Sequence, residues 1–250
     1  MVDETTISKA IIESYFERLK NCLNVDVIVV GAGPSGLTAS YYLSNLGFKV
    51  CLIEKRLSLG GGIWGGGMFF NKIVVQSEAL PILDDFGINY KRYDEEHYVL
   101  DAIELAGSLI REVAKRVEVL NGVCVEDVVV REGVEGVVVN WSASFISNLH
   151  VDPLVLRSKV VVDATGHDAV VCRITAKKTN AFDVKGEGSM HADLAEKLVV
   201  EKTGEVYPNL YVTGMAVASV YGLPRMGPIF GGMLLSGKKV AKLIADKLKS

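Results

Sequence analysis

The chain has 250 residues, of which 49% are hydrophobic and 23% are charged, and its formal net charge is -3. A mildly acidic chain lacks the basic surface that attracts nucleic acids and anionic membranes, so we expect neither as a partner. The sequence has no signal-peptide pattern and no apolar run approaching the roughly 18 residues of a membrane span, which predicts a cytoplasmic protein. Its four scattered cysteines, without a C-x-x-C spacing, argue against a disulfide framework and against a cysteine-bound zinc or iron–sulfur site.

The first half of the chain reads as alternating helices and strands. Residues 6–20 space their apolar side chains like an amphipathic helix, and the apolar run at 25–30 is typical of a parallel strand buried on both faces. A glycine-rich stretch at 59–70 is expected to lack regular structure. Helices are predicted at 78–86 and at 101–116.

The second half adds an antiparallel element and a closing helix. Two alternating stretches joined by a short turn predict a β-hairpin over about 123–141. A long helix is predicted over 227–248. These elements predict a single α/β domain over residues 1–250, with a Rossmann-like dinucleotide-binding fold, a parallel sheet and the hairpin as a small antiparallel elaboration.

A nucleotide-binding motif follows the first strand directly. Gly31, Gly33 and Gly36 form G-x-G-x-x-G at the opening of a helix, and Glu54 ends the next strand. The first glycine permits a tight turn, the second lets a pyrophosphate approach the backbone, and the third lets helix and strand pack closely, while Glu54 can accept hydrogen bonds from ribose hydroxyls. The helix N-terminus favours the phosphate charge. We therefore expect an adenine dinucleotide to bind here.

Two later features bear on which dinucleotide binds. Flavoproteins with this opening carry an Ala-Thr-Gly loop, which Ala164–Gly166 matches, and a Gly-Asp pair whose aspartate holds the flavin. In this chain Gly214 is followed by Met215. The architecture is therefore flavoprotein-like, with two dinucleotide-binding signatures, but it lacks one contact that a flavin needs.

Histidines and carboxylates stand close together in two motifs, "NLHVDP" and "ATGHD". Because Asp152 precedes a proline, it should be extended, so His150 and Asp152 project to the same side. His167 follows the apolar run "KVVVDA", and ligands of open α/β sheets gather at the carboxyl ends of strands. A carboxylate and an imidazole meeting there would make an incomplete site for Fe(II), Mn or Zn. From spacing alone, hydrogen-bonded loop residues remain the alternative.

Four stretches together resemble the thiamine thiazole synthases, in their archaeal, sulfide-using form. They are "GAGPSGLTA", "EKRLSLGGGIWGGGMFF", "HVDP…ATGHD" and "GLPRMGPIFGGMLLSGKK", of which the last is the most specific. The resemblance implies that NAD is a consumed substrate. Nicotinamide would be expelled, the ADP-ribose would condense with glycine, and sulfur would enter to give ADP-5-ethyl-4-methylthiazole-2-carboxylate.

The resemblance also implies roles for the polar residues. Asp152 and His167 match the iron ligands, so Fe(II) is the expected cofactor. Fungal and plant members carry, at the position of His150, a cysteine that surrenders its own sulfur. An imidazole cannot do so, which implies multiple turnover with external sulfide, and His150 would orient or protonate the intermediate.

Arg225 is the expected clamp for the carboxylate of glycine, because a guanidinium can make two parallel bonds to it. The residues matching Met215 and Arg225 reach a neighbouring subunit's site in the family, which implies a homo-oligomer with shared sites, an octamer as in its relatives. By motif match, the dinucleotide should be held by Gly31, Gly33, Ser35, Gly36, Glu54, Lys55, Gly62, Val125, His150, Asp152 and Met215.

Other readings stay in view. The dinucleotide motif alone would also suit an FAD- or NAD-dependent oxidoreductase, a sugar-phosphate enzyme of the ribose-1,5-bisphosphate isomerase type, or a non-catalytic nucleotide-binding module. The set of Asp152, His167 and Arg225 counts against an ordinary oxidoreductase and against a mere binding module. Of the remaining histidines, His97 is expected to be solvated and His191 to cap or pack near a helix start.

Overall fold

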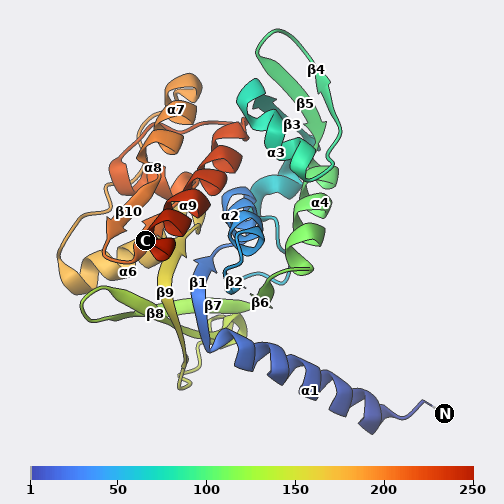
Figure 1. Ribbon diagram of the computed structural model, residues 1–250, viewed down its shortest axis with the longest axis vertical. Helices are drawn as coiled ribbons and strands as arrows, with labels where there is room; N and C mark the ends of the chain where they lie inside the picture. The colour runs from blue at the N-terminus through green and yellow to red at the C-terminus, as the bar shows by residue number, and fades with distance from the viewer. Residues whose placement is uncertain (1) are drawn as a thin grey trace.

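A computed structural model describes residues 2–250 and has the predicted α/β architecture (Figure 1). Its helices are α1 (Glu4–Cys22), α2 (Pro34–Asn45), α3 (Leu80–Asp85), α4 (Ala102–Ala114), α5 (Ser142–Ile146), α6 (Val170–Thr179), α7 (Ala192–Lys202), α8 (Met215–Tyr221) and α9 (Gly231–Lys249), with short 3-10 turns η1 (Gly61–Gly65), η2 (Ser77–Ala79) and η3 (Gly166–Asp168). Its strands are β1 (Asn24–Val30), β2 (Val50–Glu54), β3 (Lys72–Gln76), β4 (Tyr90–Arg92), β5 (His97–Asp101), β6 (Glu118–Asn121), β7 (Val123–Val130), β8 (Val134–Trp141), β9 (Leu154–Asp163), β10 (Gly204–Tyr207) and β11 (Leu210–Val212).

The main sheet has the strand order β10-β11-β9-β1-β2-β6. β1 lies at its centre and pairs in parallel with β2 and β9, whose apolar runs are also buried. Val27 and Val29 of β1 point into one hydrophobic cluster, whereas Ile28 and Val30 point into the other. Because successive side chains of a strand alternate between faces, this continuous apolar run serves two cores.

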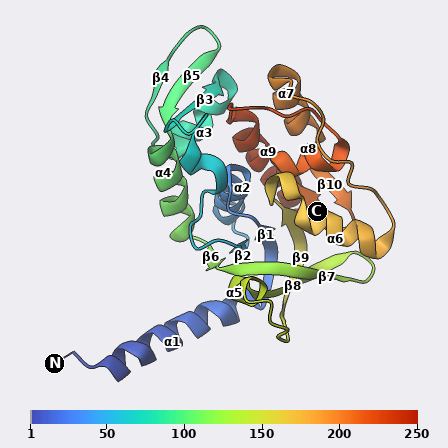
Figure 2. The same cartoon turned by 180° about the vertical axis from the view of Figure 1, so that it is seen from behind.

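Helices cover both faces of the main sheet. α2, α4 and α9 contribute to the cluster on one face, and α6, α7 and α8 contribute to the cluster on the other. Figure 1 views the first layer from the front, and Figure 2 shows α6 in front of the strands from behind. The prediction of an α/β fold around a mostly parallel sheet is confirmed.

The hairpin of β7 and β8 joins this sheet through antiparallel pairing of β8 with β9. A second sheet, of order β3-β5-β4, was not predicted from the sequence. Its strands have only three to five residues, and β4 is exposed throughout. The sequence therefore shows no run of alternating polar and apolar residues long enough to predict them. The sheet packs beside α3 and α4 at the end of the molecule far from α1 (Figure 1).

α1 extends away from the body and is capped at its N-terminus by Asp3, whose side chain accepts a hydrogen bond from the Thr6 amide. Only Cys22, its last residue, is buried. Among residues 2–250, no helix is long and apolar enough to cross a membrane.

Two predicted elements differ from the observed ones. The stretch at 59–70 is not wholly irregular, because Gly60 and Gly61 adopt positive φ and lead into the turn η1. The closing helix starts at Gly231 rather than near Gly227, because Gly227 is left-handed and Ile229 bridges to β3 instead.

Candidate functional site

A cavity of about 620 Å³ opens at the carboxyl ends of β1, β2 and β9. This volume suits a small-molecule ligand or cofactor. The cavity is lined by most of the residues predicted to hold a dinucleotide, namely Gly31, Gly33, Ser35, Glu54, Lys55, Gly62, Val125 and Met215. The position agrees with the general rule that ligands of open α/β sheets bind beyond the carboxyl ends of the strands.

The three motif glycines are needed for different physical reasons. Gly31 has φ +101°, and a Cβ there would lie 2.4 Å from the carbonyl oxygen of Ala164. A Cβ on Gly36 would lie 1.9 Å from the carbonyl oxygen of Gly31, so this residue permits the close packing of α2 on its own loop. Gly33 has no atom within 4 Å of its would-be Cβ and lines the cavity, so it is the point where a ligand can approach the backbone.

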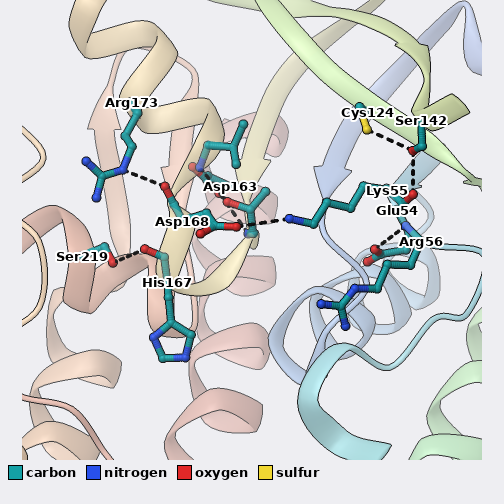
Figure 3. Close-up of polar contacts among 12 residues, drawn as sticks. Glu54, Lys55, Arg56, Cys124, Ser142, Asp163, His167, Asp168, Arg173 and Ser219 are labelled. Carbon is teal, nitrogen blue, oxygen red and sulfur yellow. Dashed lines mark hydrogen bonds and ion pairs between the residues drawn. The ribbon is translucent and has the colours of Figure 1, made fainter. Parts of the chain in front are cut away.

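Glu54 is buried at the end of β2, where it contacts Arg56 (Figure 3), and it also holds the glycine loop. One carboxylate oxygen accepts a hydrogen bond of 2.9 Å from the Ala32 amide, and the other accepts one of 2.9 Å from the Arg56 amide. Since each carboxylate oxygen can accept more than one bond, both retain capacity for ribose hydroxyls.

An ion pair crosses the cavity near Glu54. Lys55 Nζ lies 3.2 Å from Asp168 Oδ2, which links the end of β2 to the turn after β9. The carbonyl oxygen of Lys55 in turn accepts a 2.6 Å hydrogen bond from Ser142, whose hydroxyl lies 3.0 Å from Cys124 Sγ. Lys55 therefore lies beside the cavity as predicted, but its ammonium already has a carboxylate partner.

The Ala-Thr-Gly loop is held by Asp163, a residue that the sequence analysis did not single out. This fully buried carboxylate accepts hydrogen bonds from the Thr165 amide and hydroxyl through one oxygen, and from the Cys172 amide through the other. Asp163 thus ties the end of β9 to the start of α6 and fixes the loop that carries His167.

His167 and Arg225 meet at one carboxylate, that of Glu187. His167 Nδ1 lies 2.5 Å from Glu187 Oε1, and Arg225 Nε lies 3.3 Å from Glu187 Oε2. The carbonyl oxygen of His167 also accepts a 2.7 Å hydrogen bond from the Ser219 hydroxyl (Figure 3). Both His167 and Arg225 line the cavity, so an imidazole and a guanidinium face the space next to the glycine loop. Sequence reasoning missed Glu187, which carries no motif.

His150 and Asp152 lie elsewhere in the chain. Both are exposed and neither lines the cavity of its own chain, so their predicted contact with the dinucleotide stays a prediction. They precede β9, whereas His167 follows it, and a strand of ten residues is about 33 Å long. The described residues 2–250 contain no group of three or more His, Cys, Asp or Glu side chains placed to hold a metal ion.

Met215 and Arg225 line the cavity of their own chain. The reason is local: Gly214, with φ +66°, turns the chain so that α8 starts against Ser35, and the turn before α9 returns to the same edge of the sheet. That Met215 and Arg225 also reach a neighbouring subunit's site, as the resemblance implied, stays a prediction.

The two remaining histidines have structural roles. His97 is half-exposed and lies 2.9 Å from Asp94 in the β4–β5 turn. His191 caps α7 by accepting a hydrogen bond of 3.4 Å from the Leu194 amide.

The segment 142–155 exposes an unusual amount of apolar surface. Ile146 is 87% exposed and Leu149 is 65% exposed, and they are accompanied by Phe145, Val151, Leu154 and Val155. Contiguous exposed apolar surface of this kind marks an interaction site. His150 and Asp152 lie within this segment.

Comparison with known proteins identifies the family. A sequence profile of the Thi4 family matches residues 8–230. The chain is 52% identical over 252 residues to the thiamine thiazole synthase of Pyrococcus horikoshii, covering 100% of both chains, and 50% identical over 256 residues to that of Methanothermobacter thermautotrophicus, covering 99% of both.

Solved structures agree with this assignment. The crystal structure of Thermovibrio ammonificans THI4 superimposes with a TM-score of 0.98 at 46% identity, covering 100% of this chain and 99% of that one. The structure of pqsL, a probable FAD-dependent monooxygenase from Pseudomonas aeruginosa, matches with a TM-score of 0.58 at 15% identity, over 90% and 86% of the two chains, and shares the fold alone. The chain therefore belongs to the Thi4 family of thiamine thiazole synthases.

Proposed function

We propose that this protein converts NAD, glycine and sulfide into ADP-5-ethyl-4-methylthiazole-2-carboxylate with release of nicotinamide, that it uses Fe(II), and that it turns over many times. The observation that carries the proposal is the meeting of His167 and Arg225 on a cavity that also presents the glycine loop and Glu54. An ordinary dinucleotide site has no need of an imidazole and a guanidinium at that place.

The cavity provides each part of NAD with a contact. The pyrophosphate lies against the open backbone of Gly33 at the N-terminus of α2, where amides and the helix dipole favour negative charge. Glu54 accepts bonds from the adenosine ribose, and Val125 contacts the adenine. The nicotinamide end then extends toward His167 and Arg225, where the chemistry takes place.

Arg225 binds glycine through its carboxylate. Its Nε is engaged by Glu187, which leaves the two terminal nitrogens of the guanidinium for the substrate. Two parallel charge-assisted bonds orient the amine of glycine toward the ribose carbon with which it condenses.

The available donor residues can form an iron site only if two copies of the chain contribute them. Because a carboxylate only accepts hydrogen bonds, the contact with Glu187 makes His167 Nδ1 the donor and leaves Nε2 with its lone pair for a metal. The second ligand is Asp152 of the partner subunit, since Asp152 of the same chain lies at the far end of β9. When bound, Fe(II) supplies a Lewis acid with open positions for sulfide and substrate.

The apolar segment 142–155 supports the same conclusion about assembly. We infer that a second copy covers this surface, because Asp152 and His150 lie within it and have no cavity of their own to face. His150 of the partner subunit would then orient or protonate the intermediate. The octamer of the family is the assembly that we expect.

The sulfur comes from outside the chain. Position 150 is a histidine, and burial together with the neighbouring Asp163 raises the pKa of Cys172. A hydrogen bond that the Cys51 thiol makes to Cys22, together with burial, raises the pKa of Cys51. Cys124 touches the cavity beside Val125, at the end assigned to adenine. Thiols held protonated are poor nucleophiles, which argues against Cys172 and Cys51 as sulfur donors. Cys124 is disfavoured by its place at the adenine end of the cavity.

The proposal is tested by incubating the anaerobically purified protein with NAD, glycine, sulfide and Fe(II) and measuring products by mass spectrometry. We expect the ADP-thiazole carboxylate and nicotinamide, with more than one product per chain. Product limited to one per chain, accompanied by a mass loss of one sulfur from the protein, would refute multiple turnover. Intact FAD released in stoichiometric amount by denaturation would identify an oxidoreductase instead.

A further inference from the structure

Glu187 lies in a segment that is held firmly although it is not a regular element. The segment 186–191 runs alongside the stretch from Ser219 to Arg225, which carries the expected glycine clamp. Backbone hydrogen bonds join the two at Gly186 N to Ser219 O (2.8 Å), Gly188 N to Leu223 O (2.8 Å), Arg225 N to Ser189 O (3.2 Å) and His191 N to Arg225 O (3.1 Å). Glu187 therefore has a fixed position between two glycines.

The side chain of Glu187 is only 12% exposed, although the two groups that it contacts are more than half exposed. Its oxygens divide between them: Oε1 is 2.5 Å from His167 Nδ1, and Oε2 is 3.3 Å from Arg225 Nε. A second fixed point holds His167, because the Ser219 hydroxyl donates to its carbonyl oxygen over 2.7 Å. His167 is thus held both at its backbone carbonyl and at its imidazole ring.

We propose that Glu187 is a positioning residue that orients the side chains of both His167 and Arg225. It fixes His167 as the Nδ1–H tautomer, which leaves the lone pair of Nε2 available to a metal ion, and it holds the guanidinium of Arg225 by its Nε, which leaves the terminal nitrogens for glycine. Such carboxylate partners of ligating histidines orient the ring and increase its basicity. The inference rests on the proposed function for the identity of the ion and of the substrate.

A purely structural role predicts a different pattern. A residue that merely tied two segments together would affect stability, and the backbone bonds of the segment 186–191 already join them. Glu187 instead contacts the two side chains that face the substrate, and it does so from the side away from the cavity, since Glu187 itself does not line it. Its removal should therefore change metal and glycine binding separately from folding and from NAD binding.

The test compares Glu187→Gln with the wild type and with Glu132→Gln, a matched change in the exposed β7–β8 turn. A glutamine presents an accepting oxygen at one of these two positions and a donating nitrogen at the other, so it cannot accept from both partners in the present geometry. We expect Co(II) or Fe(II) to bind Glu187→Gln about 10- to 100-fold more weakly, measured by anaerobic titration calorimetry on the full assembly. The KM for glycine should rise about tenfold, with the affinity for ADP-ribose unchanged. Glu132→Gln should match the wild type in all three.

A readout that needs neither metal nor turnover separates this inference from the proposed function. The ¹⁵N shifts of the His167 ring in the metal-free protein report which nitrogen carries the proton. We expect the Nδ1–H tautomer in the wild type and a mixture in Glu187→Gln. Glu187→Asp keeps the charge but shortens the side chain by one methylene, so its population of the Nδ1–H tautomer should lie between those of the wild type and Glu187→Gln. This second variant keeps the test valid if Glu187→Gln misfolds.

The outcomes are distinct. If wild-type protein forms no thiazole product while the tautomer shift occurs, the proposed function fails and the positioning role stands for whatever ligand His167 binds. If both Glu187 variants keep wild-type metal affinity, glycine KM and tautomer, the inference is overturned. A loss confined to thermal stability would also overturn it.

Discussion

The carboxyl edge of the main sheet and the segment 142–155 are built on opposite principles. At the sheet edge, the buried carboxylates Glu54 and Asp163 accept hydrogen bonds from backbone amides and hold the glycine loop and the Ala-Thr-Gly loop. In the segment 142–155, apolar side chains face outward, and His150 and Asp152 lie among them. The first region is complete within one chain, and the second has the composition of a surface that another molecule covers.

The contrast between the two regions indicates which substitutions should affect stability and which should affect function alone. Changes at the sheet edge disturb packing and hydrogen bonds that the single chain already makes, so they should alter stability as well as binding. Changes to the exposed side chains of this segment, such as Ile146, Leu149 and Asp152, remove little that the single chain uses. They should leave folding intact and affect only what the assembled protein does.

The largest effect is expected within the glycine motif. Gly36→Ala should destabilise the protein by about 4 kcal/mol, because its Cβ would overlap the carbonyl oxygen of Gly31. Gly33→Ala should leave unfolding within about 0.5 kcal/mol of the wild type, since its Cβ meets no protein atom, but should weaken NAD binding at least tenfold. Urea unfolding and NAD titration measure the two quantities. Equal destabilisation by both changes would show that a Cβ at position 33 also overlaps protein atoms, which contradicts the open space beside Gly33.

The second prediction concerns Asp152. Asp152→Ala should reduce turnover about 100-fold or more, as loss of a metal ligand does, while changing the free energy of unfolding by less than about 0.5 kcal/mol. His167→Ala should lose activity in the same way. Activity assays and urea unfolding on the same preparations provide the comparison.

Mixing the two inactive proteins sharpens the test. If one site draws its ligands from two copies, refolded mixtures of Asp152→Ala and His167→Ala chains should recover about one quarter of wild-type activity, because each ligand comes from an intact chain in half of the pairings. No recovery above the separate variants would mean that each site is built from a single chain after all.

A smaller effect is expected from a buried carboxylate behind the cavity wall. Glu196 accepts hydrogen bonds from Gln76 and from the Gly232 amide at the start of α9, yet burial raises its pKa above the usual value. The folded protein therefore holds this proton more tightly than the unfolded chain does. Stability contributed by protonation is complete below the unfolded pKa and is lost as the pH rises through the raised folded pKa.

Glu196→Gln should abolish this loss of stability with rising pH. In the wild type, unfolding free energy should fall with rising pH above about 4.5, with a slope of at most about 1.4 kcal/mol per pH unit for one proton. The variant should show a flatter profile over the same interval, measured by urea unfolding at several pH values. Parallel profiles would mean that the pKa of Glu196 is the same in the folded and unfolded states.

The smallest effect is expected at Cys124. Cys124→Ser should keep sulfide-dependent multiple turnover within about twofold, because its Sγ contacts Ser142 beside the adenine end and a hydroxyl can replace that contact. Loss of all turnover, with stability retained, would place the sulfur donor in the cavity wall and contradict the external source.

The sequence predicted the sheet edge better than the rest because its signals are local. Gly31, Gly33, Gly36 and Glu54 belong to one strand–turn–helix–strand unit, and each has a conformational or packing reason that can be read from its neighbours. Glu187 could not be found in this way. It stands 20 positions from His167 in a stretch without periodicity, and only the folded chain brings them together.

Strand length explains why the sequence alone did not show how far Asp152 lies from His167 along one chain. The apolar run "KVVVDA" predicts only the second half of β9, which begins at Leu154, where its first residues pair with β8. The resemblance likewise marked Met215 and Arg225 as site residues, and only the fold shows that both line the cavity of their own chain.

The length of β9 has a consequence for newly made protein. A single folded chain already has its NAD cavity, whereas on the proposed function its iron site waits for another copy. A nascent chain could thus bind the coenzyme without destroying it. Consumption of NAD would begin only when protein concentration permits assembly, and the initial rate on dilution should fall more steeply than in proportion to protein concentration.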